Sequence, residues 1–285
     1  MKTLIVDSGA TKTDWLYVDG NETSHIKTEG LHPSYILDTE DFENILSQVQ
    51  ILNPDQIFFF GAGCGNPVGD EIVSRFLSRI FRKASIQVKS DLEGAGKAFF
   101  GSGDGIVGIL GTGAIAARIV KGRVETSSAS LGYAIGDEGS AADLGRRILK
   151  MYYRKTCTET THAFIGERIG DKSYGDMMNR IYRAGKPNRI LASVAGEVLS
   201  GSFPDEMRLM IKNAFSEYAD EQLSMLNLTG EEEIVITGKV AEVHREILIS
   251  LLNSKGFRHV HVRYPVVAAF RERIKTGTEV FGNPG

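Results

Sequence analysis

The chain has 285 residues, 42% of them hydrophobic and 24% charged, as in an ordinary globular protein with a sizeable core. Its net charge of −3 gives no reason to expect a nucleic acid or an anionic membrane as a partner. No apolar run approaches the roughly 20 residues that cross a bilayer, and the N-terminus enters a strand without a signal segment, so we expect a cytoplasmic protein.

The two cysteines, Cys64 and Cys157, are too few for a disulfide framework or a cysteine-rich zinc cluster. Cys64 lies among glycines in the segment GAGCG, and we expect it to be a small buried residue and not a reactive thiol.

The first motif is a turn rich in glycine and threonine near the N-terminus. An apolar strand at residues 4–6 leads into DSGATKT at residues 7–13, and a second apolar strand from Trp15 to Val18 returns. Glycines let the backbone approach a ligand, and N–H and hydroxyl groups can donate to phosphate oxygens. Residues 1 to 30 are therefore predicted to form three antiparallel strands that carry a phosphate-binding turn.

A second turn of the same kind follows roughly a hundred residues later. Ile106 to Leu110 predicts a buried strand, GTG at residues 111–113 the turn, and Ala114 to Val120 the returning strand. The repetition suggests two related halves, each of which presents a hydroxyl-bearing tip to one cleft. Two such tips suit a polyphosphate.

Strands and helices alternate between the two turns. We expect helices over residues 42–51 and 66–83, a strand covered on both faces over residues 56–60, and a further strand over residues 86–88. Asp91 follows that strand, at the start of a helix that runs to Phe100. Asp91 is either the N-cap of this helix or a carboxylate held at the mouth of a cleft.

After the second turn, residues 131–140 are predicted to be a loop in which Asp137 and Glu138 could cap the helix Ala141 to Tyr153. Residues 156–226 have a helical pattern, interrupted at residues 185–187. The last strands are expected over residues 234–237 and 259–263, and Pro265 opens the last helix. His259 and His261 lack ligand spacing, which favours a surface position at a sheet edge.

These segments, in this order, resemble a known superfamily. They are DSGATKT at 7–13, Asp91, GTG at 111–113, GDEGS at 136–140, TGKVA at 237–241 and PVVAA at 265–269. The set resembles the actin-like ATPase superfamily, and within it the eukaryotic-type N-acetylglucosamine kinases and the related bacterial activator ATPases of benzoyl-CoA reductase.

The resemblance implies an α/β fold of two ribonuclease-H-like domains with the active site in the cleft between them. The N-terminal lobe would span residues 1–100 and be completed by a C-terminal helix over residues 270–285. The C-terminal lobe would span residues 101–269, with a helical insertion at about residues 156–226.

The same resemblance implies roles for individual residues. Asp7 would hold Mg²⁺ through water, and Asp91 would be the catalytic carboxylate. The residues that would bind ATP are Gly9, Thr11, Lys12, Gly111, Thr112, Gly113, Gly238, Lys239 and Ala268. The residues that would bind the sugar are His32, Asp91, Gly132, Tyr133 and Asp137. ATP and Mg²⁺ are the implied cofactors.

Three positions depart from the kinases that the chain resembles. Those kinases usually have Asn at the position of His32, and Ser-Asn at the positions of Ala114 and Ile115. A protonated His32 could pair with an anionic group, and the two apolar residues would leave room for a bulkier substituent. We therefore expect a bulkier or anionic amino sugar to be preferred over N-acetylglucosamine.

The expected function is an ATP-dependent kinase that phosphorylates a hydroxyl of an amino sugar, N-acetylglucosamine or a related N-acetylhexosamine. Such a transfer needs Mg²⁺, donors around the moving phosphoryl group and a carboxylate on the acceptor hydroxyl. Two alternatives stay open: an activator ATPase of the 2-hydroxyacyl-CoA dehydratase or benzoyl-CoA reductase class, which would need paired cysteines for an iron–sulfur cluster, and a non-catalytic sugar or nucleotide sensor. The expected partners are a small-molecule sugar and, as the commonest assembly, a second copy of the chain.

Overall fold

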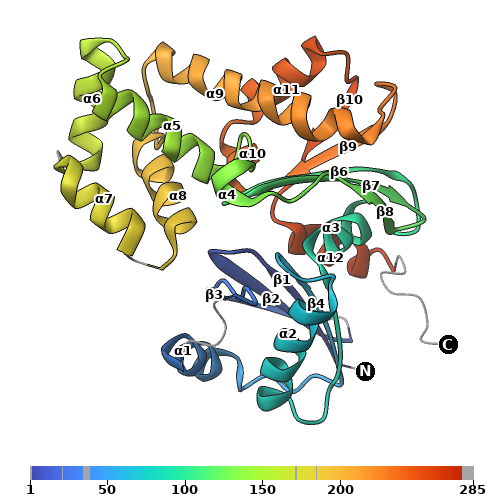
Figure 1. Ribbon diagram of the computed structural model, residues 1–285. Helices are drawn as coiled ribbons and strands as arrows, with labels where there is room; N and C mark the ends of the chain where they lie inside the picture. Colours follow the sequence, from blue (N-terminus) through green and yellow to red (C-terminus); the bar gives the residue numbers. More distant parts are fainter. Residues whose placement is uncertain (1, 21, 35–38, 171, 184, 278–285) are drawn as a thin grey trace. The chain divides into compact units, whose positions relative to one another are not determined.

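The computed structural model describes residues 2–20, 22–34, 39–170, 172–183 and 185–277. They contain two five-stranded sheets with helices around them (Figure 1). The strands are β1 (Lys2–Ser8), β2 (Lys12–Asp19), β3 (Glu22–Glu29), β4 (Gln56–Gly61), β5 (Ser85–Ser90), β6 (Gly105–Leu110), β7 (Ala114–Val120), β8 (Arg123–Ser127), β9 (Glu233–Thr237) and β10 (His259–Val262). The α-helices are α1 (Thr39–Val49), α2 (Pro67–Ile80), α3 (Asp91–Phe100), α4 (Gly132–Ile135), α5 (Ala141–Arg154), α6 (Glu159–Ile169), α7 (Tyr174–Arg183), α8 (Pro187–Val198), α9 (Asp205–Tyr218), α10 (Lys239–Val243), α11 (Arg245–Ser254) and α12 (Val266–Lys275). A π-helical turn (Ala219–Leu223) and a 3₁₀ turn (Ser224–Leu226) follow α9.

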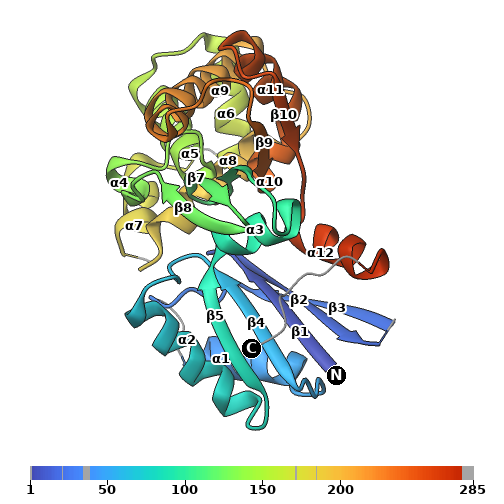
Figure 2. The same cartoon turned by 90° about the vertical axis from the view of Figure 1, so that its right-hand side faces the viewer.

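The two sheets share one topology. The first has the order β3-β2-β1-β4-β5, and the second, taken from its other edge, has the order β8-β7-β6-β9-β10. In each sheet, therefore, the first strand is central, the next two lie on one side and the last two on the other. In the first sheet β1, β2 and β3 are antiparallel while β1, β4 and β5 are parallel (Figure 2). This arrangement confirms the duplicated α/β fold expected from the sequence.

Helices cover both faces of the first sheet, as the continuous apolar strand at residues 56–60 predicted. Ile57 and Phe59 pack in a buried cluster with residues of α1 and α2. The alternate residue Phe60 stacks on Phe270 of α12, with ring centroids 5.6 Å apart. Because successive side chains of a strand point to opposite faces, α1 and α2 cover one face and α12 covers the other.

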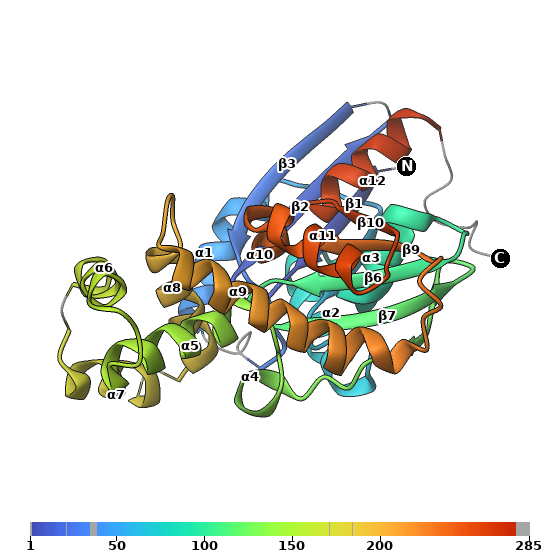
Figure 3. The same ribbon diagram turned by 90° about the horizontal axis from the view of Figure 1, so that it is seen from above.

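The helical region after the second sheet packs through close helix contacts. A Cβ atom at Gly145 of α5 would lie 1.9 Å from the carbonyl oxygen of Leu191 in α8, so only glycine permits this approach. Figure 3 shows α5, α6, α7 and α8 gathered beyond the end of the second sheet. The helical segment predicted over residues 156–226 corresponds to α6, α7, α8 and α9 with the two turns that follow α9.

The chain divides into two compact units. The first contains residues 1–107, 118–125 and 263–285, and the second contains residues 108–117 and 126–262. Residues 101–107, 118–125 and 263–269, which were expected in the C-terminal lobe, belong to the first unit, as does α12. The end of the expected helix at residues 278–285 lies outside the described residues.

The structure excludes two capping alternatives that the sequence left open, and it corrects one predicted loop. Asp91 is not the N-cap of α3, because the Ser90 side chain accepts the N–H of Glu93 and Asp91 is the first helical residue. Neither Asp137 nor Glu138 caps α5, since Ser140 does so by accepting the N–H of Asp143. The segment predicted as a loop at residues 131–140 contains the short helix α4.

The two histidines near the C-terminus and Cys64 have the exposure that the sequence predicted. His259 and His261 lie exposed on β10, the edge strand of the second sheet. Cys64 is buried, and burial, together with the charges of Asp70 and Asp91, raises its thiol pKa to about 12. Among the described helices, none is both long and apolar enough to cross a membrane.

Candidate functional site

The first glycine-rich turn is held rigidly by hydroxyl groups at its base. The Ser8 and Thr13 hydroxyls lie 2.7 Å apart, and both accept the backbone N–H of Leu31 at 3.0 Å. Gly30 presses on the tip, where a Cβ atom would lie 2.4 Å from the carbonyl oxygen of Gly9. The Gly30 N–H donates to the carbonyl of Thr11 at 3.0 Å. The loop after β3 therefore fixes the tip that carries Gly9 and Thr11.

Two carboxylates with perturbed pKa values lie at the same edge of this sheet, the one at which its parallel strands end. Asp7 is the penultimate residue of β1, and Asp91 directly follows β5. Burial, then the charges of Asp14 and Asp91, raises the pKa of Asp7 to about 7. Burial raises the pKa of Asp91 to about 6, although backbone N–H groups oppose the shift. Carboxyl groups that titrate near neutral pH are suited to proton transfer and to cation binding.

Lys12 is held in place by a residue that the sequence analysis missed. Its ammonium lies 2.7 Å from the Asp14 carboxylate and 4.7 Å from the centre of the Tyr264 ring. Asp14 is 1% exposed and also lies 2.9 Å from Nε2 of His25. Burial lowers the pKa of Lys12, but hydrogen bonds with Asp14 and Tyr264 raise it overall. The signal in the sequence was a charged residue directly before the apolar strand residues WLYV.

His32 packs on the glycine-rich exit of β4. Its Nε2 would lie 2.7 Å from a Cβ atom on Gly63, whose φ of +77° also favours glycine. Its Nδ1 accepts the N–H of Ser34 at 3.2 Å. This bond places the ring proton of the neutral imidazole on Nε2, and protonation of Nδ1 would break it. The pairing of a protonated His32 with an anionic group of the acceptor stays a prediction.

The second glycine-rich turn is joined to the GDEGS segment. The N–H groups of Ala141 and Ala142, at the start of α5, donate to the carbonyls of Gly111 and Thr112 at 2.8 and 3.2 Å. Asp137, with a φ of +59°, accepts the N–H of Ala114 at 3.2 Å. A Cβ atom on Gly113 would lie 3.1 Å from an Asp137 oxygen. Burial raises the pKa of Asp137, which the bond from Ala114 opposes.

The TGKVA segment contacts the same turn. A Cβ atom on Gly238 would lie 2.3 Å from the carbonyl oxygen of Leu110 and 3.1 Å from the nitrogen of Gly111. The hydroxyl of Thr237, a residue only 2% exposed, is buried without a hydrogen-bond partner among the described residues. Lys239 is exposed and pairs with Glu242 at 3.2 Å. Thr237 is the first residue of the TGKVA motif, but the sequence analysis assigned it no role.

The predicted site residues thus fall into two groups, one in each unit. The first unit holds Asp7, Gly9, Thr11, Lys12, His32, Asp91 and Ala268, and the second holds Gly111, Thr112, Gly113, Gly132, Tyr133, Asp137, Gly238 and Lys239. Within the first group, Asp7 lies at the end of β1, Asp91 directly follows β5, and the turn and His32 lie in the loops after β1 and β3. Ala268 is an exposed residue in the first turn of α12.

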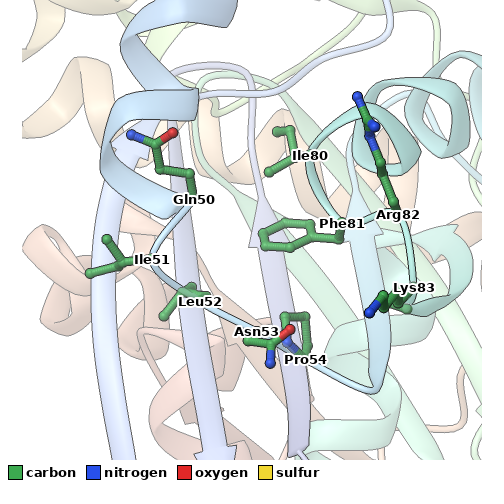
Figure 4. A pocket seen from close by; sticks show the side chains of 10 residues that line it. Gln50, Ile51, Leu52, Asn53, Pro54, Ile80, Phe81, Arg82 and Lys83 are labelled. Carbon is green, nitrogen blue, oxygen red and sulfur yellow. The ribbon is translucent and has the colours of Figure 1, made fainter.

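A surface hollow lies elsewhere in the first unit (Figure 4). It is lined by the segments that precede β4 and β5, residues 50–54 and 80–84. Because β4 and β5 are parallel, the segments that precede them lie together at the edge of the sheet where the strands begin. Asp91 lies at the opposite edge, where these strands end. The hollow contains none of the predicted site residues.

The chemistry around Asp7 fits a hydrated Mg²⁺ ion. Burial and two neighbouring carboxylates make the negative charge of Asp7 unfavourable, and a divalent cation would compensate for it. Among the described residues, no three His, Cys, Asp or Glu side chains group closely enough to ligate a metal directly. Mg²⁺ usually keeps several waters and few protein ligands.

No family model matches the chain. A curated relative, an N-acetylmuramic acid/N-acetylglucosamine kinase of Clostridium acetobutylicum, is 26% identical over 219 residues, which are 72% of this chain and 69% of the relative. A candidate N-acetylglucosamine kinase from Porphyromonas gingivalis has a solved structure with a TM-score of 0.83 and 24% identity, and the match covers 97% of this chain and 100% of that one.

Two further structures extend the likeness. A candidate N-acetylglucosamine kinase from Chromobacterium violaceum has a TM-score of 0.72 at 16% identity, with 96% of this chain and 98% of that one covered. A glucokinase of the ROK family from Streptomyces griseus, solved with glucose and AMPPNP, has a TM-score of 0.53 at 14% identity, with 96% and 97% covered.

The chain therefore has the two-domain fold of the actin-like ATPases and ROK kinases. The curated relative and the two candidate kinases confirm the resemblance inferred from the sequence, which is to sugar kinases of the N-acetylglucosamine kinase type.

Proposed function

We propose that the chain is an ATP-dependent kinase that phosphorylates a hydroxyl of an amino sugar, N-acetylglucosamine or a related N-acetylhexosamine such as N-acetylmuramic acid. The observation that carries the proposal is Asp91, a carboxylate with a pKa of about 6 at the sheet edge that also holds Asp7 and the first glycine-rich turn. The curated relative, which is named for both sugars, supports this class of acceptor.

Asp91 is proposed to accept the proton of the sugar hydroxyl as that oxygen attacks the γ-phosphorus of ATP. The Asp91 pKa of about 6 leaves most of the carboxylate ionised at pH 7. Its Oδ1 accepts the N–H of Leu92 at 2.9 Å, which fixes the side chain at the start of α3. Water bound at the same place would compete as the acceptor, so the acceptor pocket has to exclude it.

The phosphates are proposed to bind the two glycine-rich turns. Thr11 and Lys12 in one unit, and Thr112 and Gly113 in the other, would supply hydroxyl, ammonium and N–H donors. Gly9 and Gly111, whose N–H groups donate within the turns to the carbonyls of Lys12 and Gly113, would let the phosphates approach the backbone. The unpartnered hydroxyl of Thr237 would give the segment of Gly238 and Lys239 a further donor or acceptor for the nucleotide. Asp7 would hold Mg²⁺ through water, and the ion would neutralise charge on the phosphates.

His32, Gly132, Tyr133 and Asp137 are proposed to bind the sugar. Asp137 can accept hydrogen bonds from two sugar hydroxyls, and Tyr133, 37% exposed, offers an aromatic face. Nε2–H of His32 would donate to an acetyl carbonyl or to a carboxylate substituent. Ala114 and Ile115, where related kinases have polar residues, would leave apolar room for a bulkier group.

The test is an ADP-release assay with Mg·ATP and a panel of hexoses, hexosamines, N-acetylhexosamines and N-acetylmuramic acid. We expect ADP release above the rate without acceptor for at least one N-acetylated amino sugar, with mass spectrometry showing one added phosphoryl group. Equal rates with and without every amino sugar would overturn the proposal. Release with glucose alone would replace the amino-sugar acceptor by a hexose.

The two other functions considered from the sequence have less support. An activator ATPase would need cysteine pairs at a subunit interface, whereas Cys64 is buried with a strongly raised pKa. A sensor that binds without turnover would bind sugar and nucleotide in calorimetric titrations, but would give no ADP release and no phosphorylated product.

A further inference from the structure

α4 has no hydrophobic anchor of its own. It is four residues long, and none of its side chains is buried. Leu131 before it and Ile135 at its end are 55% and 74% exposed. A helix this short is unstable in isolation, and burial of an apolar face usually holds such an element in place. The position of α4 must therefore depend on polar contacts.

Those contacts come mainly from one side chain, Arg146 of α5. Its Nη1 donates to the backbone carbonyls of Tyr133 and Ala134 at 3.1 and 3.3 Å. Its Nη2 donates to the Asp143 carboxylate at 2.8 Å. Carbonyls in the last turn of a helix lack partners within the helix, and a planar guanidinium can bind two of them while pairing with a carboxylate. Figure 1 shows α4 beside the start of α5.

Asp143 makes this contact rigid. It is 1% exposed, and its other oxygen accepts Nε of Arg147 at 2.9 Å and the N–H of Gly139 at 3.0 Å. Arg147 in turn donates to Glu217 of α9. One buried carboxylate thus connects α5 to both ends of the segment between Tyr133 and Gly139, the segment that contains Asp137.

We propose that Arg146 is the residue that positions the acceptor-binding segment, by clamping α4 onto α5 so that Tyr133 and Asp137 keep their places. The proposal rests on the proposed function, since it takes this segment to bind the sugar. Arg146 does not contact the sugar itself. Its role is to hold the backbone of residues 132–136, since none of the α4 side chains is buried.

The experiment compares Arg146→Met with Arg147→Met. Both variants remove one arginine from Asp143, but only the first frees the carbonyls of Tyr133 and Ala134. For Arg146→Met we expect the KM for the amino sugar to rise about tenfold while the KM for ATP changes less than about twofold. Arg147→Met should lower the Tm at least as much, because it also loses Glu217, and keep the sugar KM. Arg146→Lys, which keeps a cation beside Asp143, should recover part of the sugar KM.

Hydrogen exchange gives a readout that needs no turnover. Amides of residues 132–136, including the N–H of Gly136 that donates to Gly132, should exchange about tenfold faster in Arg146→Met and at the wild-type rate in Arg147→Met. Equal exchange in the two variants, or an unchanged sugar KM in Arg146→Met, would overturn the proposal. If the wild-type chain phosphorylates no amino sugar, the proposed function fails, and exchange alone decides whether the clamp exists.

Discussion

Beyond the effects of burial and of Asp14, the carboxylate of Asp91 raises the pKa of Asp7, because the ionised forms of the two residues repel each other at one edge of the first sheet. Burial and the charge of Asp14 act on Asp7 in the same direction. In the proposed function the two carboxylates have different tasks, because Asp7 would face a cation and Asp91 a hydroxyl proton. A cation near Asp7 would favour its ionised form and so lower its pKa from the value of about 7.

Replacing Asp91 by Asn should reduce the rate of sugar-dependent ADP release about 10²- to 10⁴-fold, because an amide keeps the shape of the side chain but cannot take the proton. Nucleotide binding, measured by calorimetry, should stay within about twofold of wild type, since the phosphates are not its contact. Glu93→Gln, two residues further in the first turn of α3, is the matched control and should keep its activity. Turnover retained in Asp91→Asn would remove Asp91 as the base.

The rate should depend on pH through the same residue. The base has to be ionised, and its pKa is about 6, so kcat/KM for the sugar should rise as pH increases through this value and then level off. The measurement is a pH profile of kcat/KM from pH 5 to pH 8. A flat profile below pH 6.5, with the protein folded throughout, would contradict the assignment.

Asp7 gives a stability prediction of opposite sign. Its pKa is about 7 in the folded protein, against the ordinary aspartate value of 3.8, so between these values the folded state binds a proton that the unfolded state lacks. The free energy of unfolding therefore falls as pH rises through this window. In metal-free buffer, we expect the Tm at pH 7.5 to lie at least ~2 °C below that at pH 5, and Asp7→Asn to reduce the difference. The same difference in Asp7→Asn would show that other groups cause it.

Removing the charge of Asp7 should also separate nucleotide from sugar binding. Asp7→Ala should weaken Mg·ATP at least about tenfold and leave binding of the sugar alone within about twofold, because the proposed contact is with the hydrated cation. Calorimetric titrations of each ligand measure both effects. Equal weakening of both, in a variant with wild-type circular dichroism, would make Asp7 a structural residue.

Gly111 offers a clean test of the second turn. A Cβ atom there meets nothing within 4 Å, so Gly111→Ala should fold with a Tm within about 2 °C of wild type. If phosphates approach this backbone closely, the added methyl should raise the KM for ATP about tenfold. Gly238→Ala is the contrast, since its Cβ atom would lie 2.3 Å from a carbonyl oxygen and should lower the Tm. An unchanged ATP KM in Gly111→Ala would place the phosphates elsewhere.

His32 tests the choice of acceptor. If its Nε2–H donates to the substituent that distinguishes the amino sugars, His32→Asn should change the ratio of kcat/KM for N-acetylmuramic acid over N-acetylglucosamine about tenfold in favour of the latter. An unchanged ratio would make His32 a packing residue on Gly63.

The sequence predicted the parts of this protein that depend on local pattern. Apolar runs between glycine-rich turns gave β1, β2, β6 and β7, and the order of the motifs gave the fold. It did not predict the clamp of Arg146 or the Asp143 carboxylate beneath it. On a helix, charged residues in this spacing have the pattern of a solvated face. The partner of Arg146 in α4 and the partner of Arg147 in α9 both lie far from them in the chain. The capping serines Ser90 and Ser140 were missed because each lies one residue before the helix, beside more conspicuous acidic residues.

The division of the chain has a practical consequence for anyone who wants to study one unit alone. The backbone passes from one unit to the other after residues 107, 117, 125 and 262. No single truncation can therefore release an intact unit, because a fragment ending at residue 107 would lack α12 and the Phe270 ring that stacks on Phe60. An excised first unit would have to be assembled as a fusion with two designed connections, one in place of residues 108–117 and one in place of residues 126–262.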